Sequence, residues 1–178
     1  SGMHVTPGII DAHSHTAGAS INEGIQSISS EVRMDDVVVS HSIDIYRQLA
    51  GGVTATQLLH GSANPIGGQS AILKFRGGKT ADEMIMEDNF PSIKFALGEN
   101  VKRTQTRYPN TRMGVDQFFV DRFRAAKAYK ASWDKYNALS RKAMATALPP
   151  RKDLQLEPLV EILEDKRIIH CHSYRQDE

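Results

Sequence analysis

Short apolar runs alternate along this chain with stretches whose apolar residues recur at three- and four-residue steps. The apolar runs predict buried strands at residues 8–12, 53–59, 92–97 and 167–172, each followed by polar or turn-forming residues. Helical segments separate these strands, so the pattern predicts βαβ units and a parallel sheet. A parallel sheet has to be covered on both faces or closed into a barrel.

The longest predicted helix covers residues 112–147 and stops before Pro149-Pro150. Its apolar residues form a stripe at helical spacing. The members of this stripe are Val115, Phe119, Ala126, Tyr129, Trp133 and Tyr136. The basic residues of the segment fall largely off the stripe, and we expect them to form a solvated face.

Three shorter segments complete the pattern. Residues 35–50 have mixed helical spacing and end at a glycine pair, which favours a helix stop. Thr80 and Glu83 have the spacing of a capping box, so a short helix is expected to start there. Residues 154–166 predict a further helix. The glycine-rich residues 61–78 are expected to form a loop.

Composition and charge narrow the possible functions. The chain has 178 residues, which is enough for one domain with a core. Hydrophobic residues make up 40% of the chain and charged residues 24%. The formal net charge of +1 gives no field that would attract nucleic acid, and basic and aromatic residues are not interleaved. No apolar run approaches the roughly 20 residues needed to cross a bilayer. We therefore expect neither nucleic acid nor membrane as a partner.

The first residues resemble a cloning remnant. Ser1-Gly2-Met3 precedes the patterned region like a scar before a methionine start, so residues 4–178 are taken as the domain. No basic-then-apolar signal pattern follows. The single cysteine, Cys171, excludes an intrachain disulfide. We expect a soluble protein, with the cytoplasm slightly favoured and the native compartment left open.

Four of the seven histidines form two His-x-His pairs at the ends of predicted strands. His13 and His15 follow the first strand, and His170 and His172 end the last one. Residues i and i+2 of a strand point to the same face, so the two imidazoles of a pair can converge on one or two metal ions. The carboxyl ends of parallel strands share one edge, where active sites collect.

These residues carry a resemblance to a known family. The segment VTPGIIDAHSH at residues 5–15 resembles the opening barrel strand of the amidohydrolase superfamily, in particular its imidazolonepropionase-related and prolidase-like members. Residues 52–55 resemble the second strand of that family, and residues 169–172 the fifth. The resemblance implies an α/β fold, a partial (β/α)₈ TIM barrel of roughly strands 1 to 5 that lacks the flanking β-sandwich.

The resemblance also implies a metal-dependent hydrolase. Family members hold one or two divalent ions, usually zinc, which activate water to hydrolyse an amide or related C–N bond. His13, His15 and His170 match the metal-binding histidines of the family. The resemblance further implies a bridging ligand near the end of a middle strand, either a glutamate or a carboxylated lysine. The candidates are Glu99 and Lys94, which are five positions apart, so a regular strand sends them to opposite faces and at most one of them points inward. Glu99 is favoured, because it lies where the strand gives way to a loop and needs no modification to act as an oxygen ligand, and Lys94 is the alternative.

Other polar residues are candidates for secondary roles. By the resemblance, His172 is expected to face the substrate. His60 follows the second predicted strand and could line the mouth of a pocket. Asp11 shares the strand face of the first histidine pair and could support a ligand. His41 falls in a predicted helix and is expected to be an ordinary surface residue.

The chain also departs from the family pattern. The aspartate that acts as general base in the family is expected beyond Glu178, and a full barrel typically needs about 250 residues. We therefore expect a truncated barrel whose open edges favour a homo-oligomer. The sequence predicts a fragment of a zinc-dependent amidohydrolase acting on a small-molecule or peptide substrate. The alternative is a non-catalytic, metal-binding, self-associating half-barrel module.

Overall fold

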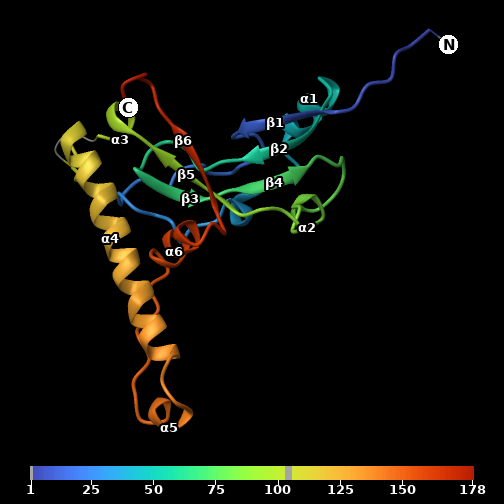
Figure 1. The fold of residues 1–178 in the computed structure, drawn as a ribbon. Helices are drawn as coiled ribbons and strands as arrows, with labels where there is room; N and C mark the ends of the chain where they lie inside the picture. Colours follow the sequence, from blue (N-terminus) through green and yellow to red (C-terminus); the bar gives the residue numbers. More distant parts are fainter. Residues whose placement is uncertain (1, 103–105) are drawn as a thin grey trace.

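The computed structural model describes residues 2–102 and 106–178 (Figure 1). In chain order, the elements are β1 (Ile9–Ser14), η1 (Met34–Val37), α1 (Ile43–Ala50), β2 (Val53–Leu58), β3 (Ile66–Gln69), β4 (Ala71–Lys74), α2 (Ala81–Met84), β5 (Ser92–Ala96), α3 (Gly98–Val101), α4 (Arg112–Asn137), α5 (Arg141–Met144), α6 (Glu157–Leu163) and β6 (Ile168–His172). The four strands predicted from apolar runs are therefore present as β1, β2, β5 and β6.

The strands form two three-stranded sheets, ordered β1-β2-β4 and β3-β5-β6. The pairs β1-β2 and β5-β6 are parallel, as the alternation of strands and helices predicts. The pairs β2-β4 and β3-β5 are antiparallel, so the prediction of a wholly parallel sheet is wrong. The described strands close no barrel, and the partial barrel stays a prediction.

The glycine-rich segment holds the two strands that the sequence pattern did not predict. β3 and β4 lie within residues 61–78, which were expected to form a loop. Glycine is needed at Gly67 because a Cβ there would come within 2.8 Å of His60 Nδ1 and 3.0 Å of the Lys94 carbonyl oxygen. Close approach to β5 thus explains a strand whose composition is typical of a loop.

The predicted helices are present with shorter bounds. α4 ends at Asn137, and Ser140 caps the separate helix α5 by accepting a hydrogen bond from the Ala143 backbone. The predicted helix at 35–50 splits into η1 and α1. Thr80 and Glu83 form the expected capping box at α2. Pro158 is the second residue of α6, where its missing N–H removes no helical hydrogen bond.

Two apolar clusters hold the sheets to their helices. Leu58, Leu73 and Met84 are buried in the cluster beneath the first sheet. Phe95 of β5 is buried in the other, where Phe119 of α4 stacks on it at a centroid distance of 5.6 Å. Helices α4 and α6 therefore cover the second sheet, and α4 continues beyond it as an arm with α5 at its end (Figure 1).

The length and apolar character of the helices decide whether any of them could cross a membrane. Within residues 2–102 and 106–178, none combines the length and the apolar character that crossing a bilayer requires.

Candidate functional site

The first histidine pair lies at the carboxyl end of β1. The pairing of β1 with β2 is irregular between Asp11 and Ser14, the stretch that includes His13. Ser14 is buried, whereas His13 and His15 are exposed on the other side of the chain, as the i, i+2 spacing predicts. Their ring centroids are 5.4 Å apart, with the rings nearly perpendicular.

Lys94 of β5 reaches this pair from the neighbouring sheet. Its side chain is 1% exposed, and its Nζ lies 3.2 Å from His13 Nε2. Burial lowers the pKa of Lys94, because an ammonium loses its hydration in the protein interior. Lys94 is also the direct cross-strand partner of His170 on β6. Lys94 therefore links the two histidine pairs, which lie at opposite ends of the sequence.

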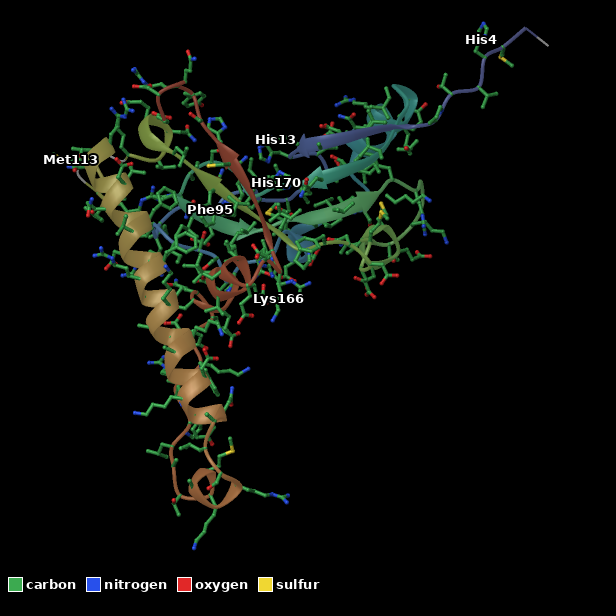
Figure 2. The ribbon with its side chains drawn as sticks, viewed as in Figure 1. His4, His13, Phe95, Met113, Lys166 and His170 are labelled. Atoms are coloured by element: carbon green, nitrogen blue, oxygen red, sulfur yellow. The ribbon has the colours of Figure 1, made fainter. Side chains whose placement is uncertain are left out.

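His170 is held by a glutamine that the sequence pattern did not single out. The side-chain Nε2 of Gln57, on β2, is 2.9 Å from the Nε2 of His170. The same Gln57 nitrogen donates a hydrogen bond to Ser92 Oγ at 2.7 Å. Figure 2 shows His13 at the end of β1, with His170 close by on β6. An amide side chain in a strand that otherwise holds apolar and threonine residues was the available signal for Gln57.

A cavity of about 360 Å³ opens beside the histidines. Its lining residues are His13, His15, Asn22, Ser62, Ala63, Asn100, His172 and Tyr174. His172 Nε2 is buried and has no hydrogen-bond partner within the described ranges, while the ring packs edge-on against Tyr174 at 4.5 Å. An unpaired ring nitrogen at a polar cavity can bind a ligand group. Asn22, Asn100 and Tyr174 are further lining residues that the sequence did not indicate.

The electrostatics of the site favour neutral imidazoles. Desolvation is the largest cause that lowers the pKa of His13, His170 and His172, and the charge of Lys94 is the second in each case. Each of these rings is therefore mostly neutral at pH 7, which is the form that binds a metal ion or accepts a proton.

Glu99 lies outside this cluster. Gly98 has a φ of +46° and ends the strand geometry, so Glu99 starts in α3, and its carboxylate pairs with Lys102. The structure thus brings Lys94, the alternative candidate, to the histidines, and leaves Glu99 in a helical ion pair.

His60 and Asp11 stabilise backbone segments. His60 is 1% exposed, with Nδ1 2.8 Å from the Gly61 carbonyl oxygen and Nε2 accepting from the Glu23 N–H at 2.8 Å. Both ring nitrogens are therefore occupied, and His60 does not line the cavity. Asp11 Oδ1 accepts from the His13 N–H at 3.1 Å, which supports the chain that presents the histidine.

A larger cavity, about 620 Å³, lies at the amino ends of β5 and β6, near Pro91 and Arg167. Its lining is mostly charged and polar and contains no histidine. The carboxyl ends carry the histidines, which agrees with the usual location of ligands in parallel α/β sheets.

The donors of this site meet the requirements of a divalent ion only in part. Within the described residues, no three His, Cys, Asp or Glu side chains gather closely enough to form a metal cluster by themselves. His15 nevertheless has a ring nitrogen suited to ligation. Its Nδ1 lies 2.9 Å from the Leu59 carbonyl oxygen, which can only accept, so Nδ1 carries the proton and the lone pair of Nε2 is free. The donor chemistry fits a divalent ion if Lys94 is neutral or carries an anionic group.

Comparison with known proteins gives two relatives. No family model matches the sequence. The chain is 31% identical over 199 residues to amidohydrolase tasK of Hapsidospora irregularis, a match that covers 97% of this chain and 20% of the relative. The crystal structure of an amidohydrolase from Thermotoga maritima MSB8 superimposes with a TM-score of 0.83 at 32% identity, covering 97% of this chain and 46% of that one.

The chain therefore spans less than half the length of either relative. Both names support an amidohydrolase family and, broadly, a hydrolase function. The mixed α/β domain matches an amidohydrolase structure over nearly all of its length.

Proposed function

We propose that this chain carries part of the metal site of a metal-dependent amidohydrolase, one that hydrolyses an amide, peptide or cyclic amide bond. The observation that supports this most directly is the convergence of His13, His15 and the buried Lys94, with His170 on the adjacent strand. A buried lysine beside neutral imidazoles has no evident packing benefit, and perturbed groups of this kind concentrate at functional sites.

His13, His15 and His170 would hold one or two divalent ions, most simply zinc. When bound, such an ion lowers the pKa of a coordinated water and polarises the scissile carbonyl. The hydrogen bond between His15 Nδ1 and the Leu59 carbonyl fixes the ring for ligation through Nε2. His172 faces the cavity and would bind the substrate through its unpaired nitrogen.

Lys94 would serve as the anionic ligand after carboxylation. The neutral Lys94 amine forms a bond from Nζ to the carbon of carbon dioxide and releases one proton, which leaves a carbamate anion on the side chain. The lowered pKa of Lys94 favours the neutral amine that this reaction needs. Glu99 remains the other candidate, and its pairing with Lys102 would have to break for it to act as a ligand.

The test of the metal site is metal content per chain, measured by inductively coupled plasma mass spectrometry on protein purified without chelator. We expect near-stoichiometric zinc, lost in His13→Ala and His15→Ala. The exposed His41 lies outside the cavity, so His41→Ala is the matched control and should keep the metal. Protein without metal that also takes up no added zinc would refute the proposal.

A second comparison distinguishes the two candidate bridging ligands. Lys94→Ala should lose metal while Glu99→Gln keeps it, and native mass spectrometry should show the mass of one added carbon dioxide on the parent chain and on Glu99→Gln, and none on Lys94→Ala. The reverse pattern of metal loss would assign the role to Glu99.

The alternative function, a metal-binding module without catalysis, is favoured by the openness of the site. His13 and His15 are exposed to solvent, whereas catalytic metal sites usually exclude bulk water. Hydrolysis of a panel of dipeptides and cyclic amides by the metal-loaded chain separates the two functions. Turnover that disappears in His172→Ala supports the enzyme, and stoichiometric metal without turnover supports the module.

A further inference from the structure

The arm formed by α4, α5 and residues 145–156 carries an aromatic groove far from the histidines. A cavity of about 350 Å³ lies between α4 and α6 and includes Tyr129, Trp133 and Val160 in its lining. Trp133 meets Tyr129 edge-on at 6.4 Å and Tyr136 at 6.1 Å. These rings continue the apolar stripe toward the carboxyl end of α4, past the α4 residues that pack in the core of the second sheet.

Trp133 has a hydrogen-bonding capacity that its own chain does not use. Its Nε1 is buried and finds no acceptor among the described residues. A buried donor without an acceptor is unfavourable, so a ligand that brings a carbonyl oxygen to this position gains a hydrogen bond as well as aromatic contact. The groove is therefore suited to an extended peptide segment.

The rim of the groove is acidic overall. Its carboxylates belong to Asp134, Glu157, Glu161 and Glu164, and its cations to Lys130 and Lys152. Lys130 pairs with both Asp134 and Glu164, Lys166 pairs with Glu164 as well, and Arg167 binds Glu161. Glu157 has the weakest charge compensation, because its ion-pair partner Lys152 is 3.8 Å away and largely exposed, and the Tyr129 hydroxyl that donates to it is neutral. A cationic side chain is the group that Glu157 would attract.

A segment with the complementary features lies on the same arm. Leu148 is 93% exposed, Pro149-Pro150 follows it, and Arg151 is exposed with no ion pair within the described ranges. Proline pairs hold the chain extended before binding, so docking in an aromatic groove costs little conformational entropy. The carbonyl groups of this stretch supply acceptors, and Arg151 supplies the cation.

We infer that residues 148–151 of a second copy of this chain dock in the groove around Trp133, with Arg151 beside Glu157. Leu148 of the same copy is almost fully exposed, so it leaves its own groove open. The segment adjoins Lys152 on the groove rim, so a two-fold axis at this position lets both copies exchange segments reciprocally. The arm is thereby a dimerisation element that is independent of the proposed hydrolase site.

The experiment uses the full chain, and Trp133 is its only tryptophan. Sedimentation velocity over a concentration series measures association, and tryptophan emission at the same concentrations reports the groove directly. We expect a dimer whose formation shifts the emission. Arg151→Glu and Glu157→Lys should each weaken association by about tenfold or more, because each places like charges together.

Mixing the two variants provides the decisive test. In the heterodimer, the two reversed charges face each other at one groove, and the unaltered Arg151 and Glu157 face each other at the second. Both contacts then join opposite charges, so the mixture should recover the parent affinity. Arg141→Glu is the matched control, since Arg141 is an exposed arm residue outside the groove lining and its reversal should leave association unchanged.

Three results would overturn the inference. The first is a monomer at all concentrations up to about 100 µM. The second is a dimer that Arg151→Glu and Arg141→Glu weaken equally, which would mean a general charge effect. The third is a monomer whose emission shifts with a synthetic Leu-Pro-Pro-Arg peptide, which would assign the groove to a foreign proline-containing partner.

Discussion

Replacing Lys94 by methionine should stabilise the metal-free protein while removing its proposed metal ligand. Lys94 is 1% exposed, and its side-chain amine lies against His13 Nε2 at 3.2 Å. Methionine has a similar length and fills the same space without a charged group. The substitution therefore isolates the cost of burying the amine.

The magnitude follows from two opposing contributions. A buried polar group without full compensation costs about 1–3 kcal/mol in proteins. The hydrogen bond to His13 returns roughly 0.5–1.5 kcal/mol. The free energy of unfolding should therefore rise by about 1 kcal/mol, which corresponds to a melting temperature higher by about 2–4 °C for a chain of this size.

The stability that Lys94→Met gains over the parent protein should become smaller at high pH. Burial lowers the pKa of Lys94 below its usual 10.5. Between the folded-state pKa and 10.5, the unfolded chain binds more protons than the folded one, so the stability of the parent protein rises with pH across this window. The advantage of Lys94→Met is greatest below the folded-state pKa and shrinks as the pH approaches 10.5.

The assay is urea denaturation with chelator present, at neutral pH and near pH 10. The exposed Lys74 provides the control, because Lys74→Met should change stability by less than about 0.5 kcal/mol at either pH. A Lys94→Met protein less stable than the parent by about 1 kcal/mol, or a difference that is identical at both pH values, would refute the reasoning.

The remaining predictions concern stability. Phe95→Ala removes a buried ring at the stacked aromatic core and should cost about 3–5 kcal/mol in denaturant titrations, whereas exposed Phe90→Ala should cost almost nothing. Thr80→Ala should cost about 1 kcal/mol through loss of the capping box. The hydrogen bonds of Lys79 and Thr80 hold the pKa of Glu83 at about 2, below its usual 4.5. The ionised carboxylate should therefore contribute fully to stability above pH 4.5, and this contribution should be lost as the pH falls through about 2, which an NMR titration checks. Asn64→Ala removes the amide that donates to the Glu23 and Gln26 carbonyls and to the buried Ser29 Oγ, so it should lower the melting temperature, and an unchanged value would contradict that network.

The sequence by itself determined the local elements of this protein. Apolar runs placed β1, β2, β5 and β6, and the i, i+2 spacing put His13 and His15 on one side of β1. Thr80 and Glu83 marked the start of α2. These features depend on interactions between residues a few positions apart, which is why a one-dimensional pattern reveals them.

Only the tertiary structure decided how the distant parts meet. Strand alternation showed that Lys94 and Glu99 could not both face inward, but the positive φ of Gly98 and the pairing of β5 with β6 decided that Lys94 lies against the histidines. The same holds for β3, which is rich in glycine and forms because β5 lies beside it. Pairing between strands is set by contacts between residues far apart in the chain, and their energy does not appear in the local periodicity of either strand.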